Sequence, residues 1–308
     1  MPMTSSHDAP QPISAQGPKR RLIVGCGYLG ARLARRFLEQ GDVIFGLSRR
    51  PERAGVSHEN WHPLAGDVSQ PETLPPLPEV ETVVYAVSYR PGCGASREAL
   101  YRNGPLAIAE RLPQVPQVFA YLGSTGVYGD HGGRPVDEWA ECRPLRASAA
   151  AMWAGEHALQ ASRVGERLLV FRLAGLYGPG RLPLVDRLRR GEPLPTDPDA
   201  MLNLVHVDDA ARLIAAGCDR LTPPGVYNVA DGRPVSRREF YSDLAERMGL
   251  PSPRFAPPER DAAAGRRAKG HLGAKRIVAD KILRELGIAL MYPNYQEALR
   301  RIVEAETA

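Results

Sequence analysis

The run RLIVGCGYLG, residues 21–30, places a short apolar segment directly before three closely spaced glycines. Its β-branched start is typical of a buried strand. Beyond the glycines, apolar residues return at the spacing of one helix face, and a glycine follows that is a typical helix stop: they are Leu29, Leu33, Phe37 and Leu38, then Gly41. The run therefore predicts a strand, a tight turn and a helix in immediate succession.

Gly25, Gly27 and Gly30 give this turn the pattern G-x-G-x-x-G, with Tyr28 and Leu29 inside it. Between a strand and a helix, such glycines permit a tight turn, close approach of the backbone to a pyrophosphate, and close helix packing. The helix N-terminus also attracts an anion. The pattern favours a dinucleotide-binding turn over a purely structural glycine turn.

The second expected strand, VIFGL at residues 43–47, is followed by Ser48, Arg49 and Arg50. A protein specific for NAD usually places an acidic side chain there, to bind the ribose hydroxyls. Arginine instead suits a 2′-phosphate by charge and by bidentate geometry, so we expect NADP to be favoured over NAD. A solvated basic turn without preference is the alternative. Asp42 precedes the strand and is too early for the acidic role.

The chain continues to alternate between apolar strands and helical segments. Further strands are expected at 82–88, 117–124, 167–178 and 225–230, with helices at about 97–111 and 147–162, and a strand edge that runs into a helix over 203–217. This alternation predicts an α/β protein with a Rossmann-type, doubly wound parallel sheet and a smaller C-terminal substrate lobe. We expect the ligand pocket between the two parts, at the carboxyl ends of the strands.

The expected division has four parts. Residues 1–19 read as a disordered leader, and residues 20–178 as the nucleotide-binding domain, completed by about 204–230. Residues 179–203 and 231–308 form the small lobe, with short helices at 182–190, 280–286 and 295–304. Ser236 and Glu239 form a capping box there. The Pro- and Gly-rich stretch 251–275 is expected to be a long loop or lid.

Composition limits the class of protein. The 308 residues are 43% hydrophobic and 24% charged, as in ordinary globular proteins. Neither a membrane span nor a signal peptide is recognisable, so we expect a cytoplasmic protein. The net charge is +5, but the arginines are scattered, so no nucleic-acid partner is expected. Four widely spaced cysteines predict reduced thiols, and no metal site is expected.

Eight segments together resemble one family: GCGYLG (25–30), GDV (66–68), YAVS (85–88), STGVYG (124–129), RLAGLYGPGR (172–181), NLVHVDDAA (203–211), VYNVAD (226–231) and KRI (275–277). They resemble the extended short-chain dehydrogenase/reductase superfamily, which includes NAD-dependent epimerases and dehydratases, and are most similar to its atypical YeeZ-like branch. The resemblance covers nearly the whole chain after the leader. It implies that Asp67 and Val68 meet the adenine, and that Ala86 and Val87 line the cofactor. It also places Asn103 on the helix after the fourth strand and makes Ser124 the group that polarises the substrate oxygen.

The superfamily's chemistry uses a Tyr-x-x-x-Lys pair on the helix after STGVYG, where the lysine lowers the tyrosine pKa. A glutamate commonly follows the tyrosine by eight residues, and Glu156 sets that register here. It places Ser148 at the tyrosine position and Met152 at the lysine position. No other register supplies the pair, because residues 20–268 contain no lysine. The resemblance to the atypical branch implies the same loss.

Several other residues are candidates for the missing acid or base. Tyr128 is the first, as a catalytic phenol or as a packing or substrate contact, and Tyr177 is expected to line the pocket. His206 with Asp208 and Asp209 is more typical of capping and packing than of a metal site. Glu138 resembles the acidic loop residue that precedes a proline in extended members, and His157 is more typical of a solvated or hydrogen-bonded histidine than of a catalytic one. The remaining candidates are ligands for an anionic substrate, with a solvated loop as the alternative for the first two: Arg266, Arg267 and Arg276.

The sequence thus predicts an NAD(P)-binding oxidoreductase or epimerase/dehydratase-like protein without the usual Tyr and Lys. Its substrate would be a small molecule with a hydroxyl or carbonyl group, such as a sugar nucleotide. The alternative is a non-catalytic dinucleotide-binding sensor or regulator. A homodimer is one oligomeric state that is compatible with the sequence.

Overall fold

A seven-stranded parallel sheet forms the centre of the protein. The computed structural model describes residues 17–256 and 274–307. The strand order is β12-β7-β5-β4-β1-β2-β3, and every neighbouring pair is parallel. In chain order the strands are β1 (Arg20–Val24), β2 (Val43–Ser48), β3 (Trp61–Ala65), β4 (Thr82–Tyr85), β5 (Val118–Ser124), β7 (Leu168–Leu173) and β12 (Gly225–Val229). The predicted Rossmann-type fold is confirmed.

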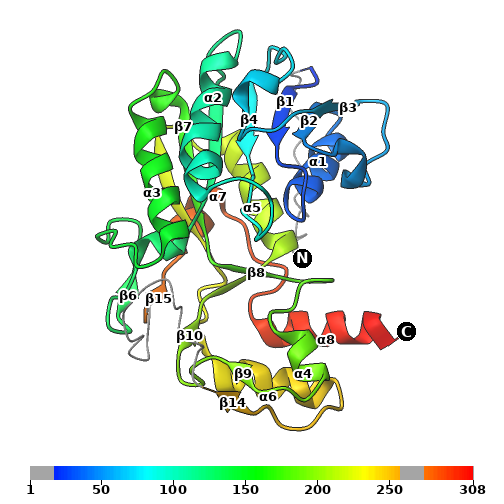
Figure 1. The fold of residues 1–308 in the computed structure, drawn as a ribbon, viewed down its shortest axis with the longest axis vertical. Helices are drawn as coiled ribbons and strands as arrows, with labels where there is room; N and C mark the ends of the chain where they lie inside the picture. The colour runs from blue at the N-terminus through cyan, green and yellow to red at the C-terminus, as the bar shows by residue number, and fades with distance from the viewer. Residues whose placement is uncertain (1–16, 257–273, 308) are drawn as a thin grey trace, which may run out of the picture.

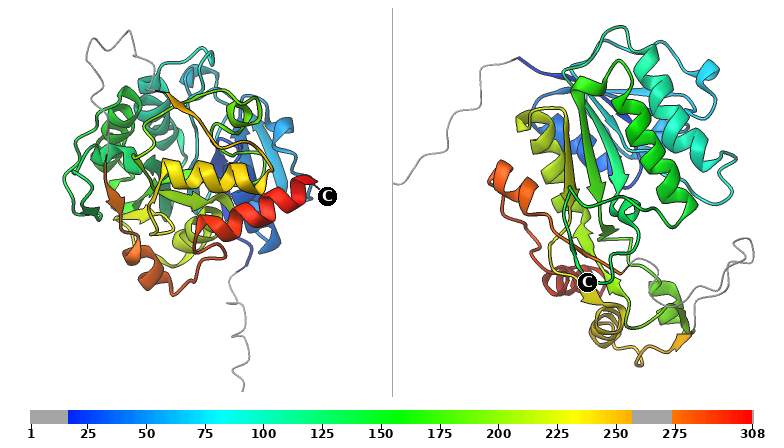
Figure 2. Two further views of the ribbon diagram at one scale, coloured as in Figure 1. Left: turned by 90° about the horizontal axis from the view of Figure 1, so that it is seen from below. Right: turned by 90° about the vertical axis from the view of Figure 1, so that its left-hand side faces the viewer.

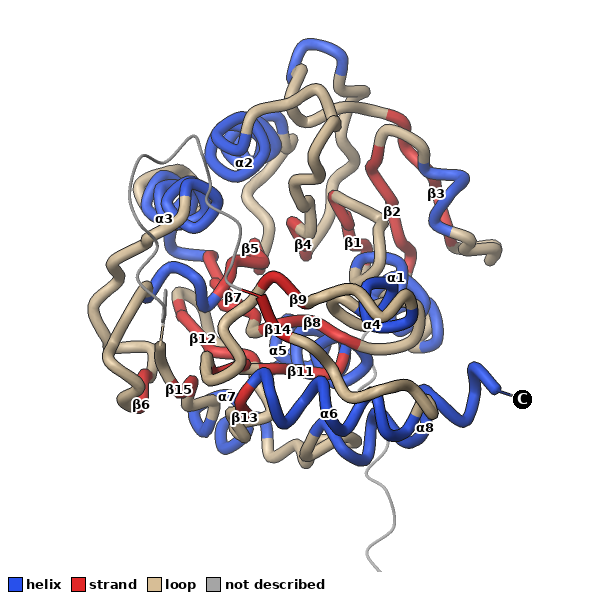
Figure 3. Tube along the Cα trace, turned by 60° about the horizontal axis from the view of Figure 1, so that its bottom comes forward, coloured by secondary structure: helices blue, strands red, loops and turns tan. Residues whose placement is uncertain are grey.

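Helices cover both faces of this sheet (Figures 1 and 3). On one side lie α1 (Gly30–Glu39), α5 (Val207–Arg220) and α7 (Asp280–Leu286). On the other lie a π-helical turn (Ala99–Asn103), α2 (Gly104–Arg111) and α3 (Ala147–Gln160). Each layer buries its own apolar cluster against the sheet, with Leu33, Phe37 and Ile214 in the first and Tyr101, Ile108 and Leu159 in the second. Both faces of the central strands are therefore buried from solvent.

Below the carboxyl ends of the strands lies the small lobe (Figures 1 and 2). It contains α4 (Val185–Arg189), α6 (Arg237–Arg247) and α8 (Tyr295–Thr307) around a third apolar cluster. Two-residue strands β9 (Leu194–Pro195), β10 (Met201–Leu202), β13 (Val235–Ser236) and β14 (Phe255–Ala256) pair around it. Ser236 Oγ accepts from Glu239 N, 3.1 Å away, so Ser236 caps α6 as predicted.

Two short sheets join the lobe to the main domain. β8 (Gly175–Tyr177) pairs with β11 (Leu204–His206), and β6 (Pro135–Val136) pairs with β15 (Arg276–Ile277). One strand was expected over 167–178. β7 instead ends at Leu173; Ala174 N still donates to Val229 O of β12, and the chain then continues as β8, which pairs with β11 outside the central sheet.

Two further differences concern the edge of the sheet and the end of the chain. β3 was not expected, since WHPLA lacks a continuous apolar run, but it pairs with β2 as the outer strand. α7 was expected in the small lobe, yet Ile282 and Leu286 belong to the α1–α5 cluster of the main domain. Residues 1–16 of the expected leader and residues 257–273 of the expected lid, with Arg266 and Arg267, lie outside the described residues. In the described part, no helix is long and apolar enough to cross a bilayer.

Candidate cofactor and substrate site

The three glycines of the first turn have three different surroundings. A Cβ on Gly25, whose φ is +97°, would lie 2.8 Å from the backbone of Ala86 and Val87. A Cβ on Gly30 would lie 2.1 Å from Gly25 O, so α1 packs on the turn itself. A Cβ on Gly27 would meet nothing within 4 Å. Two glycines are thus required by the fold, while the third leaves one side of the turn open.

The N-terminus of α1 faces this open side without a negative partner of its own. Leu29, the residue before the helix, gives no side-chain cap, and the first turn contains no acidic residue. The unpaired N–H groups and the helix dipole therefore favour an anion there. Tyr28 borders the turn: its hydroxyl donates to Pro179 O at 3.1 Å, and the Arg32 guanidinium lies 4.2 Å from its ring centroid.

Ser48, Arg49 and Arg50 end β2 at the same edge of the sheet. Arg49 and Arg50 are exposed, and Ser48 O accepts from Gly66 N. Arg49 Nη1 donates to Cys93 O at 2.9 Å, which ties the end of β2 to the loop after β4. Arg49 has five N–H donors, of which this contact uses one.

The residues assigned to the adenine and cofactor lining lie beside the turn. Asp67 Oδ1 accepts from Ser69 N and Ser69 Oγ, at 2.9 and 2.7 Å, which orients the carboxylate. Val68 is buried, whereas Ala86 and Val87 are half-buried where the backbone passes Gly25. Asn103 is exposed at the end of the π-helical turn and accepts from Arg102.

Ser124 ends β5 and begins a short 3-10 turn, Thr125–Tyr128, which we call the Ser124 turn and which closes at Gly129. Ser124 Oγ accepts from Gly126 N at 3.1 Å, so its own proton can be donated elsewhere. Tyr128 is fully buried, and its hydroxyl donates to Asn228 Oδ1 at 2.8 Å. Burial raises the pKa of Tyr128 to about 12, despite Arg172 4.9 Å from its ring centroid. Tyr128 is therefore a neutral phenol at neutral pH.

α3 begins beside the Ser124 turn and contains the three residues of the expected register. Ser148 and Met152 are half-buried, and Met152 packs against both apolar clusters of the main domain. Glu156 is 6% exposed and forms an ion pair with Arg172 of β7. Burial raises the pKa of the Glu156 carboxyl, and Arg172 opposes that shift. Met152 therefore puts a thioether where the resemblance expects a cation.

Tyr177 and His206 lie on the paired strands β8 and β11 and are buried with Asp231. His206 Nδ1 accepts from Asp208 N at 3.3 Å, so His206 caps α5. Asp209 accepts from the backbone N–H groups of residues 291 and 292, both at 2.8 Å. Across the described residues, no group of three or more His, Cys, Asp and Glu side chains could hold a metal ion.

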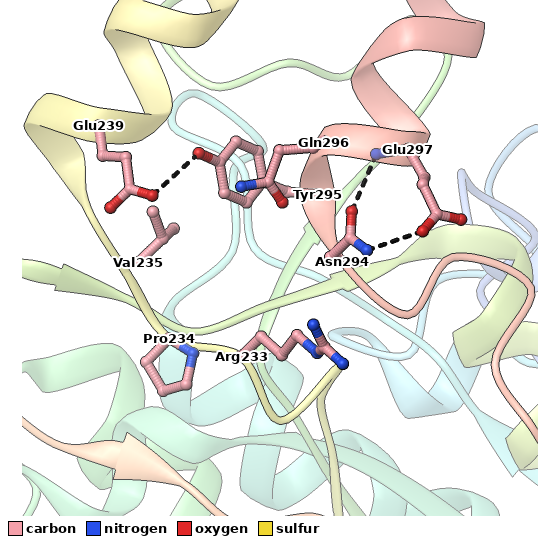
Figure 4. Close-up of a pocket in the computed structure, with 8 residues that line it drawn as sticks. All are labelled: Arg233, Pro234, Val235, Glu239, Asn294, Tyr295, Gln296 and Glu297. Carbon is pink, nitrogen blue, oxygen red and sulfur yellow. Dashed lines mark hydrogen bonds between the residues drawn. The ribbon is translucent and has the colours of Figure 1, made fainter.

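A separate hollow of about 460 Å³ lies in the small lobe, between β13–α6 and the start of α8 (Figure 4). Tyr295 donates across it to Asp243 at 2.7 Å and contacts Glu239 at 3.5 Å. None of the residues assigned to the cofactor or to Ser124 lines this hollow.

Sequence reasoning missed one basic residue at the end of the Ser124 turn. Lys275 Nζ donates to Gly129 O at 3.0 Å, and burial, reinforced by the charge of Arg146, lowers the pKa of Lys275. The signal available was the lysine-free stretch 20–268, which leaves Lys275 as a conspicuous cation. Arg276, the predicted anion ligand, is exposed and donates to Gly133 O.

The glycine turn, the parallel sheet and the serine at the end of β5 define a dinucleotide-binding protein of the Rossmann type. The model of the NAD dependent epimerase/dehydratase family matches residues 22–230, and the chain belongs to that family.

The chain is also similar to individual proteins over most of its length. The chain is 28% identical to Protein YeeZ of Escherichia coli strain K12 over 285 residues, covering 90% of this chain and 97% of YeeZ. It is 31% identical to a functionally unknown conserved protein from Silicibacter pomeroyi, with a TM-score of 0.73 over 94% of this chain and 100% of that one. MoeE5, solved in complex with UDP-glucose and NAD, shares the fold with a TM-score of 0.75 at 22% identity, over 94% of this chain and 98% of its own.

Proposed function

We propose that this chain is an NAD(P)-dependent oxidoreductase or epimerase that acts on a hydroxyl or carbonyl group of a sugar-nucleotide-like substrate. The observation that carries the proposal is the pairing of an open glycine turn with a serine that has a free proton. Gly27 offers space where Gly25 and Gly30 offer none, and Ser124 Oγ accepts one hydrogen bond while its own O–H remains available to donate. Both stand at the carboxyl ends of the parallel strands, where Rossmann-type folds bind their ligands.

In this proposal the backbone of Gly25–Gly30 and the N-terminus of α1 would hold the cofactor's diphosphate. Asp67, Val68, Ala86 and Val87 would line the adenine and the path beyond it. Arg49 and Arg50 would contact a 2′-phosphate, which supports NADP over NAD. When bound, the nicotinamide would exchange a hydride with the substrate carbon. Ser124 would donate its proton to the substrate oxygen and hold it in place.

The usual proton relay has no counterpart in α3. Ser148 and Met152 replace the tyrosine and lysine, and a thioether cannot lower the pKa of a neighbouring group. Tyr128 is a weak candidate because its proton is donated to Asn228 in the interior. We therefore propose that the proton is exchanged through Ser124 and water, or through a group on the substrate.

A hydride-exchange assay tests the proposal. Purified protein is incubated with NADPH or NADP and a panel of sugar nucleotides, ketones and aldehydes. Net oxidation or reduction is followed by absorbance of the reduced nicotinamide, and epimerisation, which consumes no cofactor, by the nuclear magnetic resonance spectrum of the sugar nucleotide. Turnover that Ser124→Ala reduces at least about a hundredfold supports the enzyme, since removing one such donor costs about 10²–10³ in rate. Cofactor binding without any turnover supports the second candidate, a non-catalytic sensor, which the replacements at Ser148 and Met152 favour.

A further inference from the structure

A second hollow, of about 280 Å³, lies at the surface of the main domain between α1 and α5. The two helices pack side by side on one face of the central sheet (Figures 1 and 3). Most of its lining is charged: Arg32, Arg35, Arg36, Glu39, Asp208 and Arg212. We call this hollow the α1–α5 groove. None of the residues assigned to the cofactor or to Ser124 lines it.

One face of α1 forms half of the groove. Arg32, Arg35, Arg36 and Glu39 follow one another at the spacing i, i+3, i+4 and i+7, so their side chains leave the helix on the same side. The first two turns of α5 supply the opposite wall. Together the two helices place four arginines and two carboxylates around the groove, which gives its lining a formal charge of +2.

Backbone carbonyls fix two of the arginines of α1. Arg32 Nη1 donates to Tyr28 O at 2.8 Å, and Arg35 Nη2 donates to Gly55 O at 2.9 Å. A carbonyl oxygen holds a guanidinium in place without neutralising its charge. Each of these guanidiniums has five N–H donors, and the contacts with carbonyls use only some of them. The arginines are therefore oriented and still have donors for an anion.

Carboxylates neutralise only two of the four arginines. Asp208 Oδ1 accepts from Arg32 Nε at 3.0 Å, which joins α1 to α5. Asp209 Oδ1, which is buried, lies 3.2 Å from Arg212 Nη1. These two ion pairs use the acidic residues at the start of α5, so they leave the arginines further along α1 unpaired.

Arg35 and Arg36 have no carboxylate partner in the part of the chain that the structure describes. Glu39 follows them by one turn of α1, yet it forms an ion pair with neither. Arg36 is half-buried, and none of the described residues accepts a hydrogen bond from its guanidinium. Two positive charges at one groove thus lack a counter-charge, and their mutual repulsion decreases when an anion binds between them.

We propose that the α1–α5 groove is a binding site for a phosphate dianion, which Arg35 and Arg36 hold. A dianion matches the formal charge of the lining, and guanidiniums bind phosphate oxygens in a fork. Free phosphate and a phosphate monoester share this chemistry. Met291, which is 46% exposed and lines the groove, offers an apolar contact to the organic part of an ester. The site goes beyond the proposed function, because it requires neither Ser124 nor a bound nicotinamide.

Calorimetric titration of the full-length protein with sodium phosphate, and separately with glucose 6-phosphate, tests the groove. Each titration is run at about pH 8, where both ligands are dianions, with and without saturating NADPH, because the glycine turn also attracts an anion. We expect saturable binding with a dissociation constant of about 1 mM or lower, which NADPH does not abolish. Tighter binding of glucose 6-phosphate supports a monoester as the ligand, and equal or weaker binding supports free phosphate.

Substitutions separate this groove from ordinary surface charge. Arg35→Gln and Arg36→Gln should each weaken phosphate binding by about fivefold or more, since each removes a charge-assisted contact. Glu39→Gln should strengthen binding by about twofold or more, because it removes a negative charge from the lining. Arg220→Gln is the matched control. Arg220 lies at the far end of α5, also donates to a carbonyl, that of Leu286, and does not line the groove, so its loss should change the affinity little.

Three results would overturn the site: no saturable binding by the wild-type protein up to about 10 mM phosphate, displacement of phosphate by NADPH, or equal effects of Arg36→Gln and Arg220→Gln. Sodium acetate that binds as tightly as phosphate would overturn the choice of a dianion. None of the four substituted side chains is buried, and circular dichroism checks that each variant is folded. If NADPH does not bind, the proposed function fails, whereas the opposite effects of Arg36→Gln and Glu39→Gln still decide the groove.

Discussion

Arg172 Nη2 lies 2.7 Å from Glu156 Oε2, and its Nε lies 3.1 Å from the same oxygen, in an ion pair that water barely reaches. The pair joins α3 to β7. Glu156 Oε1 also lies so close to Gly123 that a Cβ there would be 3.0 Å away. One carboxylate therefore fixes α3, β7 and the end of β5 relative to one another, directly before Ser124.

Glu156→Gln should destabilise the protein by about 3 kcal/mol, because it leaves the Arg172 charge buried and unpaired. Urea unfolding followed by circular dichroism measures the change. Glu141→Gln is the control, since the Glu141–Arg143 pair is exposed and should contribute little to stability. Equal losses in the two variants would show that the buried pair does not hold the helix.

Gly27→Ala should leave stability within about 1 kcal/mol of the wild type, because its Cβ meets no protein atom. Cofactor affinity should fall at least about tenfold, since the methyl group occupies the space beside the helix N-terminus. Gly30→Ala is the contrasting variant and should destabilise the fold itself, because its Cβ would clash with Gly25 O. Thermal melts and NADPH fluorescence titrations separate the two effects. Unchanged affinity in Gly27→Ala would place the cofactor elsewhere.

Arg49→Ala should weaken NADPH binding by about tenfold or more and change NADH binding little, because only NADPH carries the 2′-phosphate. Fluorescence titration of both cofactors gives the ratio. Arg20→Ala, at the opposite end of β1, removes the same charge far from the site and should leave the ratio unchanged. Equal affinities of the wild-type protein for the two cofactors would refute the NADP preference before any substitution is made.

Tyr128→Phe should cost about 1–3 kcal/mol of stability, because it leaves Asn228 Oδ1 buried without its donor. Once a substrate is found, turnover in this variant should stay within about threefold of the wild type, well short of the loss expected for a general acid or base. A loss of a hundredfold or more would instead make Tyr128 the catalytic phenol.

Asp231→Asn should change how stability depends on pH. Burial raises the pKa of Asp231 from 3.8 to about 7, opposed by its contacts with Arg233, so the folded protein keeps a proton that the unfolded chain has released. The Asp231 contribution to the free energy of unfolding is therefore intact near pH 4 and decreases as the pH rises to about 7.

The substitution removes that loss. The free energy of unfolding of Asp231→Asn, relative to that of the wild type, should therefore be higher at pH 8 than at pH 4. The expected increase is up to about 4 kcal/mol, since one pKa unit corresponds to about 1.4 kcal/mol. Its amide can still accept from Arg233 N, as Asp231 Oδ1 does now. Urea unfolding of both proteins at the two pH values measures the difference. A stability difference that is the same at both values would contradict a raised pKa.

The main domain was predictable because its signals are local. RLIVGCGYLG contains strand, turn and helix within ten residues, and the strong apolar runs at β4, β5 and β7 are self-evident. β3 was missed because Pro63 and His62 interrupt its pattern, and it is held by β2 on one side only. The position of α7 was also missed, since a seven-residue helix carries no sign of which core it joins.

The residues of the candidate site also fall into two groups, those that local motifs predict and those that only the folded structure brings together. The glycine turn and Ser124 follow from contiguous motifs. The Glu156 register follows from resemblance, but its partner Arg172 is sixteen residues away, and only the packing of α3 on β7 brings them together. Lys275, whose ammonium donates to Gly129 O at the end of the Ser124 turn, comes from a segment 146 residues away, so no spacing rule could have placed it there.

The return of the chain to the main domain after the small lobe limits how the protein can be cut. A fragment that ends at residue 256 would retain all seven strands of the central sheet, yet it would lose Ile277, Ile282 and Leu286 from the α1–α5 cluster. It would also lose Lys275, the donor to Gly129 O. A boundary after the last strand of the central sheet is therefore not a place to divide the gene for expression, because the nucleotide-binding domain is complete only when the residues after 256 are translated with it.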